Sequence, residues 1–496
     1  MPSALLRRLL ISLVFLFGSL LALRAEVTCP PIFSDHMVLQ RDLPAPVWGR
    51  ATPGEQVTVE FAGQRHTATA TSTGDWRITL RPLRTSREPR PLTIRGTNTL
   101  TFTDVLVGEV WFCSGQSNME KPFGPRKGQK PVDHSDTEVA AANHPQLRLF
   151  QMPHSGKSKA GDASQQWLVC SPEALTQSGF SAAAYYFGRE LLTTLDVPIG
   201  LIHSSFGGTR IEAWMPSTAF SPSPELRDLP QQKYQAWVPG VQATELYTSM
   251  VAPFVPFALR GFLWYQGEAN CMEADIALYP AKQRALIAAW RAAFQRADAP
   301  FYFALLAPFD YSRWEKFPKK LTPEALPAFW EAQARTLDVP HTGLIVTTDL
   351  AGNVHDIHPT NKKDVGLRFA RLALKETYGK KKIPAHGPRF AKFQPLTGAR
   401  LRVTFSDAAG LRSRDGQPLT DFQIAGLDGV FYPATATVEK NAVIVSSPQV
   451  PAPAAVRFAW HETATPNLIN AAGLPAVPFR TDTQPIRLER PPTDKK

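Results

Sequence analysis

The sequence has few cysteines and no C-x-x-C pair. Only four occur in 496 residues, at Cys29, Cys113, Cys170 and Cys271, and their spacing argues against a zinc site. An oxidising compartment would permit disulfides. Cys113 and Cys271 both flank loops at the ends of predicted strands, so a bond between them is one possibility, although sequence alone does not fix the pairing.

Long apolar runs are absent, with one exception near the N-terminus. Leu9 to Leu23 is apolar, follows Arg7 and Arg8, and is followed by the small residue Ala25. This order is typical of a secretory signal peptide, which predicts that residues 1–25 are removed on export. The alternative is an uncleaved anchor, but the run is short for a spanning helix. We therefore expect an exported protein, periplasmic or extracellular, without stable membrane association after cleavage.

Blocks of one charge are also missing, apart from Lys380–Lys382. The formal net charge is +11, and loss of residues 1–25, which hold three arginines and no acidic residue, leaves +8. The lysine run is typical of a solvated helix end, and the other basic residues are scattered. No nucleic-acid partner is expected from this distribution. The oligomeric state cannot be predicted from it.

The chain is too long for one ordinary core, so several domains are expected. Residues 26–104 contain short strand-like runs with turn signals such as Thr52-Pro53-Gly54, which favours a small β-sandwich. Residues 105–385 alternate strands with helices, which predicts an α/β domain with a parallel sheet. Residues 386–490 return to a β pattern, and residues 491–496 form a polar tail.

The α/β region has a regular order of predicted elements. Strands are expected at 105–112, 147–152, 199–204, 259–265, 301–307 and 344–348. Helices are expected at 180–195, 281–296, 323–337 and 361–378, the third interrupted at Pro327.

A serine stands where the first of these strands ends. The apolar run Val105 to Phe112 leads into Gly115-Gln116-Ser117-Asn118. A buried parallel strand delivers the following loop to the carboxyl edge of the sheet, where α/β proteins bind ligands. We therefore interpret Ser117 as a nucleophile, which requires a base and an oxyanion site. The alternative is an ordinary loop in which Ser117 or Asn118 caps the next helix.

Two other strands also end in loops suited to an oxyanion site. Gly207 and Gly208 follow the strand at 199–204, and their backbone N–H groups lack side-chain shielding. Asn270 follows the strand at 259–265 and offers a side-chain donor. Taken singly, these residues also fit a tight turn and a loop cap. Their equivalent positions at the sheet edge favour a shared site.

A base is expected from the loop after the last strand. His355 and His358 lie between residues 348 and 361, and the histidine pKa is suited to general base catalysis near neutral pH. Asp356 is two residues before His358. A solvent-exposed loop histidine is the alternative for His358. A metal site at His355 and His358 would need a third ligand, which the sequence does not supply.

Four motifs occur in order at these strand ends: C-S-G-Q-S-N-M at 113–119, F-G-G-T-R-I-E-A-W at 206–214, W-Y-Q-G-E-A-N at 264–270 and D-I-H-P-T-N-K at 356–362. Three further blocks accompany them: D-H-M-V-L-Q-R at 35–41, F-S-A-A-A-Y-Y-F-G at 180–188 and F-R-T-D at 479–482. Together they resemble the sialate O-acetylesterase family of SGNH-type hydrolases, over nearly the whole chain beyond residue 25.

The resemblance implies a three-layer α/β/α SGNH-type domain and hydrolysis of O-acetyl groups on sugars without a metal or cofactor. By position, Ser117 would be the nucleophile and His358 the general base and acid. The backbone N–H groups of Ser117 and Gly208 and the side chain of Asn270 would form the oxyanion hole. An acetylated carbohydrate would be the partner.

One position departs from the wider fold group. The triad acid usually stands three residues before the histidine, and that position is His355 here. Asp356 is the expected orienting carboxylate, Asp349 is the next candidate, and a Ser-His dyad is a third option. The expected sugar contacts are Gln116, Arg210, Glu212, Gln266 and Trp214. Arg210 and Glu212 would equally fit a structural ion pair.

Three functions remain open from the sequence. The first is a sialate O-acetylesterase-like enzyme, and the second is an enzyme of the same mechanism that acts on acetylated xylan or another polysaccharide. The third is a non-catalytic carbohydrate-binding protein, which the aromatic residues Trp48, Trp214 and Trp460 would serve if they were exposed.

Overall fold

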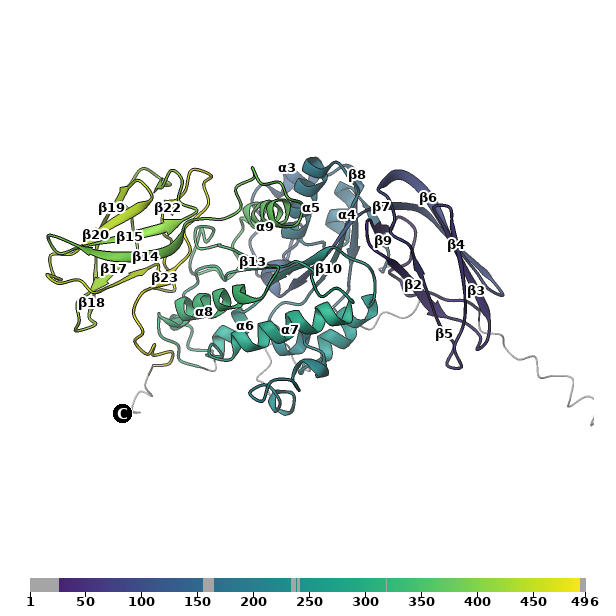
Figure 1. Cartoon of the computed structure of the whole chain (residues 1–496), viewed down its shortest axis with the longest axis horizontal. Coiled ribbons are helices and arrows are strands. Elements are labelled where there is room, and N and C mark those ends of the chain that lie inside the picture. Colours follow the sequence, from purple (N-terminus) through teal and green to yellow (C-terminus); the bar gives the residue numbers. More distant parts are fainter. Residues whose placement is uncertain (1–25, 155–164, 233–237, 239–240, 318, 491–496) are drawn as a thin grey trace, which may run out of the picture.

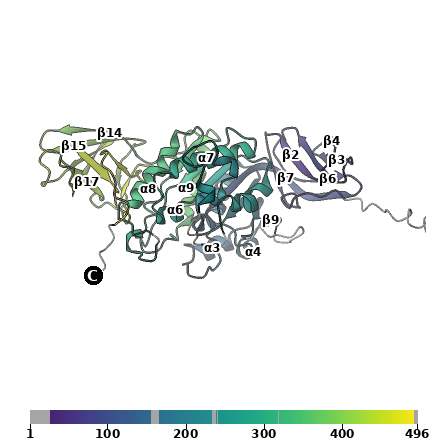
Figure 2. The same ribbon diagram turned by 90° about the horizontal axis from the view of Figure 1, so that it is seen from below.

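The computed structural model describes residues 26–154, 165–232, 238, 241–317 and 319–490. The predicted signal peptide, residues 1–25, and the polar tail, residues 491–496, lie outside the described residues. Within the described part of the chain, no helix has the length and apolar character needed to cross a membrane. A central α/β unit has one β unit on either side of it (Figures 1 and 2).

The central unit is built on a sheet in the order β13-β12-β11-β7-β10-β8-β9. All neighbours pair in parallel except β9, which is antiparallel to β8. The strands are β7 (Thr99–Gly115), β8 (His144–Gln151), β9 (Trp167–Cys170), β10 (Ile199–Ser205), β11 (Gly261–Tyr265), β12 (Phe301–Ala304) and β13 (Thr342–Ile345). Strands β7, β10 and β11 are central and apolar because both faces are covered.

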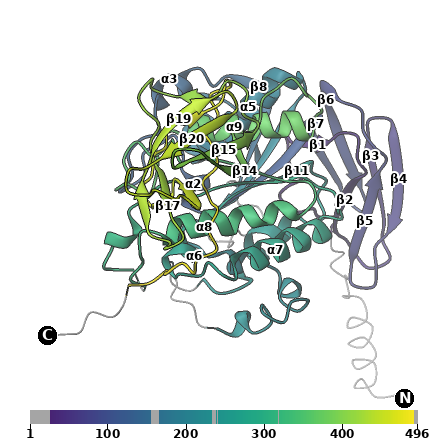
Figure 3. The ribbon, with the colours of Figure 1, turned by 60° about the vertical axis from the view of Figure 1, so that its left-hand side comes forward.

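Helices cover both faces of this sheet, which gives the three-layer α/β/α architecture (Figures 1 and 3). One layer contains α5 and α9, which pack on each other, and the opposite layer contains α7 and α8. The helices are α2 (Ser117–Glu120), α3 (Ser135–Ala140), α4 (Pro172–Gln177), α5 (Ala182–Leu195), α6 (Glu268–Met272), α7 (Tyr279–Ala293), α8 (Ala325–Ala334) and α9 (Lys362–Glu376). The predicted fold class is therefore confirmed.

Strand β7 belongs to two units at once. Its first residues pair with β6 of the N-terminal unit, and its last residues pair with β10 and β11 of the central sheet. The sequence boundary drawn at 104/105 therefore falls inside one strand. The other N-terminal strands are β1 (Val38–Gln40), β2 (Ala45–Arg50), β3 (Gln56–Phe61), β4 (Gln64–Thr69), β5 (Asp75–Leu80) and β6 (Ser86–Arg95). Strands β2 and β5 pair separately from the sheet that contains β3, β4 and β6.

A buried carboxylate joins the N-terminal and central units. Glu109 is fully buried in β7 and accepts hydrogen bonds from Arg41 Nε (2.6 Å) and Arg260 Nε (2.7 Å). Tyr378, after α9, donates to it at 3.0 Å. Burial acts to raise the pKa of Glu109, but the two guanidinium groups outweigh burial and lower the pKa.

The C-terminal unit is all β, with its own apolar core. Two four-stranded antiparallel sheets have the orders β14-β15-β20-β19 and β18-β17-β21-β23, and β16 pairs with β22. The strands are β14 (Arg389–Leu396), β15 (Arg400–Ser406), β16 (Arg412–Ser413), β17 (Phe422–Ala425), β18 (Phe431–Pro433), β19 (Thr435–Glu439), β20 (Ala442–Ser446), β21 (Ala455–Phe458), β22 (Leu468–Ile469) and β23 (Phe479–Arg480). Arg457 and Arg480 of this unit pair with Glu324 and Glu331 of the central unit.

Several details correct the sequence expectations. Pro327 does not interrupt a helix, because it lies in the first turn of α8, where its missing N–H has no helical partner to lose. Cys113 and Cys271 do not form a disulfide, since all four cysteines are free thiols. Trp214 and Trp460 are buried, and Trp48 is partly buried against Phe33. These tryptophans therefore offer no exposed sugar platform.

Candidate active site

The candidate site begins at the turn between β7 and α2. Gly115 has φ +142°, and a Cβ on it would lie 2.1 Å from the carbonyl oxygen of Tyr265 in the neighbouring strand. The turn therefore requires glycine. The next residue, Gln116, donates its backbone N–H to the same carbonyl at 2.9 Å. This places Ser117 at the carboxyl edge of the sheet, where its side chain lines a cavity of about 280 Å³.

His358 reaches this cavity from the loop between β13 and α9. The loop ends at Asn361, whose side chain caps α9 by accepting the N–H of Asp364 at 3.0 Å. His358 Nε2 lies 3.0 Å from Ser117 Oγ, within hydrogen-bond distance. Its neighbour His355 turns elsewhere, with Nδ1 3.1 Å from a carboxylate oxygen of Asp310. Ser117 and His358, which follow the first and the last predicted strands of the central unit, thus meet over one cavity.

The charge on His358 is controlled by its surroundings. Burial is the largest cause that lowers its pKa, which is about 4. The positive charges of Lys362, Lys121 and Arg126 lower it further, and Asp356 opposes them. The imidazole is therefore neutral near pH 7 and can accept a proton from Ser117.

The two candidate triad acids lie in different places. Asp356 Oδ1 accepts the backbone N–H of His358 at 3.0 Å, but it is 3.9 Å from His358 Nδ1, too far for a hydrogen bond. Asp349 instead forms a two-point ion pair with Arg368, at 2.7 Å and 2.6 Å. The structure thus keeps Asp356 beside the histidine and ties Asp349 to α9.

Two residues that line the cavity have backbone N–H groups without a hydrogen-bond partner in the described part of the chain. Gly207 donates its N–H to Glu120 Oε2 at 2.7 Å, and a Cβ on Gly207 would lie 2.9 Å from that oxygen. Gly208 follows with φ +74°. Within the described residues, the N–H groups of Ser117 and Gly208 donate no hydrogen bond, and both residues line the cavity. This arrangement is suited to stabilising an oxyanion.

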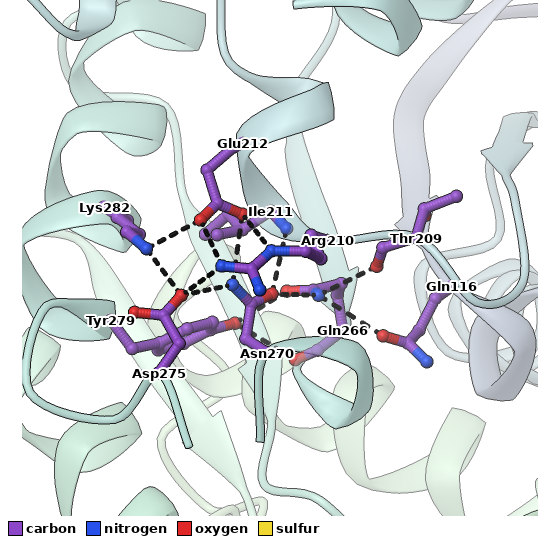
Figure 4. A network of polar contacts seen from close by, with 10 residues as sticks. All are labelled: Gln116, Thr209, Arg210, Ile211, Glu212, Gln266, Asn270, Asp275, Tyr279 and Lys282. Atoms are coloured by element: carbon purple, nitrogen blue, oxygen red, sulfur yellow. Dashed lines mark hydrogen bonds and ion pairs between the residues drawn. The ribbon is translucent and has the colours of Figure 1, made fainter. Parts of the chain in front are cut away.

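Asn270 does not face the cavity as the sequence suggested. Its Nδ2 donates to Glu212 (3.1 Å) and Asp275 (2.8 Å), and its Oδ1 accepts from Ile211 N and Gln266 Nε2. Both amide hydrogens are therefore already used in a buried network (Figure 4). Sequence reasoning missed this because Glu212 comes from a distant position in the chain, and nothing in the local sequence shows that Asp275 turns back to Asn270.

Arg210 and Glu212 belong to the same network rather than to the cavity lining. Arg210 Nη2 lies 2.8 Å from Glu212 Oε1, and Lys282 Nζ lies 2.6 Å from that oxygen and 2.5 Å from Asp275. Glu212 and Lys282 are each 1 % exposed. Burial opposes ionisation of Glu212, but the Arg210 and Lys282 charges hold its pKa well below its usual range. These contacts agree with a structural ion pair between Arg210 and Glu212 and not with a sugar contact. Trp214 is also buried, behind the site.

Gln266 and Gln116 connect this network to the cavity. Gln266 Nε2 donates to Gln116 Oε1 at 3.3 Å, and Tyr279 holds Gln266 Oε1 at 2.9 Å. Gln116 Oε1 also accepts the N–H groups of Gly267 and Ala269, which fixes the orientation of its amide. Its Nε2 turns away from the network (Figure 4), and Gln116 lines the cavity. Gln116 thus has the free amide donor that Asn270 lacks.

A second cavity of about 600 Å³ adjoins the first, and Arg126 lines both. Glu120 stands at the junction, with Oε2 2.9 Å from Arg126 and Oε1 2.6 Å from His154. The His154 ring stacks on Phe206 at 4.5 Å between centroids. Sequence reasoning missed Glu120 and Arg126, although Glu120 directly follows the first motif. The described residues contain no group of three or more His, Cys, Asp or Glu side chains that could hold a metal.

Comparisons with known proteins show which family the chain resembles. A family model for the carbohydrate esterase, sialic acid-specific acetylesterase, matches residues 107–375. The sialate O-acetylesterase of Homo sapiens is 28 % identical over 422 residues, covering 77 % of each chain. That of Mus musculus is 27 % identical over 451 residues, covering 77 % of this chain and 80 % of the other.

A solved structure gives the same result. The crystal structure of a novel carbohydrate acetylesterase from Xanthomonas citri is 36 % identical, with a TM-score of 0.80, and covers 92 % of this chain and 100 % of that one. The fold, the ordered motifs and these matches together identify a hydrolase that acts on acetyl esters. The chain belongs to the sialic acid-specific acetylesterase family of carbohydrate esterases.

Proposed function

We propose that the protein is an exported, sialate O-acetylesterase-like enzyme that removes O-acetyl groups from sugars through an acetyl-serine intermediate. One observation carries this proposal: Ser117 Oγ lies 3.0 Å from His358 Nε2, beside unpaired N–H groups at the cavity surface. A nucleophile within reach of a neutral base, next to oxyanion donors, is the arrangement that acyl transfer requires.

In the first step, Ser117 Oγ attacks the acetyl carbonyl carbon while His358 Nε2 takes the hydroxyl proton. The carbonyl oxygen becomes negatively charged in the tetrahedral intermediate. We assign its stabilisation to the N–H groups of Ser117 and Gly208, and to Nε2 of Gln116 in place of Asn270. The bond to the sugar oxygen then breaks, and His358 gives its proton to that oxygen.

In the second step, water hydrolyses the acetyl-serine. His358 takes a proton from the water as the oxygen attacks the acetyl carbon, and the same donors hold the second oxyanion. Collapse of the intermediate releases acetate and returns the proton to Ser117 Oγ. Asp356 stays beside His358 and acts on the imidazole ring through its negative charge, since its hydrogen bond is to the backbone N–H of His358 and not to the ring.

The sugar is assigned to the junction of the two cavities. The acetyl group enters the cavity over Ser117, and the rest of the glycan extends past Arg126 into the larger one. The family supports O-acetylated sialic acid as the substrate, and acetylated xylan or another polysaccharide is the alternative. Measuring acetate release from O-acetylated sialoglycans beside acetylated xylan decides between them.

The mechanism is tested with an aryl acetate and two variants. Ser117→Ala should abolish hydrolysis, whereas His355→Gln, on the same loop as His358 but turned toward Asp310, should retain it. A serine-directed organophosphate should add one covalent label, located at Ser117 by peptide mass spectrometry. Retained activity in Ser117→Ala, or no labelling of the wild type, would contradict the mechanism and favour a binding protein.

Export is tested separately. Because Arg7, Arg8 and the apolar run up to Leu23 are typical of a signal peptide, the protein should be recovered outside the cytoplasm, with a new N-terminus near residue 26. Cell fractionation followed by N-terminal sequencing measures this. Recovery of the uncleaved chain in the cytoplasm would contradict it.

A further inference from the structure

The residue after the serine, Asn118, is buried between two ionisable side chains. Its Oδ1 accepts a hydrogen bond from Lys362 Nζ at 2.6 Å, and its Nδ2 donates to Glu268 Oε1 at 2.5 Å. Lys362 is the first residue of α9, and Glu268 is the first residue of α6. Opposite charges on the two sides of the amide fix which end carries oxygen.

Neither ionisable partner serves the acyl-transfer steps directly. Lys362 is fully buried, and Glu268 is 1 % exposed. The described part of the cavity lining includes neither of them, nor Asn118. Burying a lysine and a carboxyl group is costly unless each is paired or hydrogen-bonded, and here both are bonded to the Asn118 amide.

The second hydrogen of the Asn118 amide connects Asn118 to the loop that carries His358. It is donated to the backbone carbonyl of Ile357 at 3.0 Å, the residue directly before His358. A closed ring of contacts results: Ser117 is bonded to Asn118, Asn118 holds Ile357, Ile357 is bonded to His358, and His358 returns to Ser117 at 3.0 Å. The His358 loop and the Ser117 turn are thereby fastened together behind the reacting atoms.

We propose that Lys362, Asn118 and Glu268 form a positioning cluster that holds His358 against Ser117, the orienting task that a triad carboxylate performs in other serine hydrolases. The inference rests on the proposed function of Ser117 and His358. It accounts for a histidine that meets the serine although Asp356 is 3.9 Å from its Nδ1. All three members are positioning residues, since none of them contacts the substrate.

Lys362 has a second effect, on the charge of His358. Four charged side chains act on that imidazole: Lys362, Lys121 and Arg126 disfavour the imidazolium, and Asp356 favours it. Burial and the Lys121 charge lower the pKa of Lys362 itself to about 7, while Glu268 and Asp356 oppose that shift. Burial likewise raises the pKa of Glu268 to about 7. The cluster therefore changes its charge state close to neutral pH.

The first experiment separates orientation from substrate binding. Asn118→Ala should lower kcat for an aryl acetate by roughly 10²-fold, as expected when a base is displaced by about 1 Å. KM should change little, because the side chain lies outside the cavity lining. Glu268→Gln keeps an oxygen for Asn118 Nδ2 and should retain most of kcat, whereas Glu268→Ala should lose it.

The second experiment uses the pH profile. Lys362→Met removes the positive charge that most strongly disfavours the imidazolium, so the acid limb of kcat/KM should move to higher pH. Lys363→Met is the matched control: it lies next in α9, is half exposed and pairs with Glu138, and its acid limb should stay in place. Folding of every variant is checked by thermal melting and by circular dichroism.

Three results would overturn the positioning cluster: Asn118→Ala with unchanged kcat, Glu268→Gln as impaired as Glu268→Ala, or an unmoved acid limb in Lys362→Met. Each would be seen in an enzyme whose wild type hydrolyses the ester and labels at Ser117. If the wild type does neither, the proposed function itself fails instead. The two failures are therefore distinguishable.

Discussion

Asp356 Oδ1 lies 3.9 Å from Nδ1 of His358 while it accepts the backbone N–H of the same residue at 3.0 Å. The carboxylate therefore supports the loop more than it orients the ring. Asp356→Asn keeps an oxygen acceptor and should lower kcat by less than about tenfold, far below the ~10⁴-fold loss that follows loss of a true triad carboxylate. Steady-state kinetics measure this. A loss near 10⁴ would mean that the carboxylate bonds Nδ1 during turnover.

The pH profile should have an unusually low acid limb. The pKa of His358 is lowered to about 4, chiefly by burial, so the neutral imidazole persists well below pH 6.5. The sign follows directly: kcat/KM rises with pH as His358 loses its proton, and it should be nearly constant between about pH 5 and 7. Initial rates for an aryl acetate give the profile. An acid limb with its midpoint near pH 6.5 would show that burial does not lower the pKa of His358.

Gln116 and Asn270 should respond differently to truncation. Gln116→Ala removes a free amide donor at the cavity and should lower kcat by about 10²–10³-fold. It also leaves the N–H groups of Gly267 and Ala269 without their acceptor, so the melting temperature should fall as well. Asn270→Ala leaves the buried N–H of Ile211 without its acceptor, whereas Glu212 and Asp275 keep Arg210 and Lys282 as donors, so it should destabilise the fold by about 1–3 kcal/mol with little change in kcat. Kinetics and denaturant unfolding of both variants test this assignment. The reverse pattern would restore Asn270 as the oxyanion donor.

Glu120 should affect kcat because it holds the loop that contains Gly207 and Gly208. It accepts the N–H of Gly207, and it pairs with Arg126 and His154. Glu120→Ala frees Gly207 and shifts the adjacent Gly208 N–H, so kcat should fall by about 10-fold or more. Glu120→Gln keeps one acceptor oxygen and should be less impaired. Equal kcat in both variants and the wild type would show that the loop holds its shape without Glu120.

Glu109 offers a stability prediction away from the site. Glu109→Ala leaves the Arg41 and Arg260 guanidinium groups without their buried partner, which should cost about 3–5 kcal/mol in the free energy of unfolding. Urea unfolding measures the change. The kcat of the folded fraction should be unaltered, since the contacts of Glu109 lie at the seam of two units. An unchanged free energy of unfolding would show that Glu109 does not stabilise the contact between the N-terminal and central units.

The sequence was sufficient for the parts of the site that depend on strand ends. Gly115, Gly207 and the loop before α9 each follow a run whose apolar pattern marks a buried strand, so the meeting of Ser117 and His358 could be anticipated. Strand and helix bounds were close for the same reason. Parallel pairing brings such ends together whatever the intervening chain does.

The sequence was insufficient where the partner of a side chain decides its role. Arg210, Glu212 and Asn270 carry groups suited to binding a sugar, but Asp275 and Lys282 enclose them, and both are far in sequence from Arg210 and Glu212. Nothing local distinguishes a buried ion pair from an exposed one. Likewise, a motif match includes Lys362 without revealing that it lies beneath the histidine loop.

Strand β7 passes without a break from the outer β unit into the centre of the catalytic sheet. No flexible linker separates the two units. The turn that carries Ser117 therefore follows directly on a strand whose other end is paired in the neighbouring unit. Melting the outer unit would withdraw support from the middle strand of the sheet. We therefore expect the N-terminal unit and the site at Ser117 to unfold in a single cooperative transition.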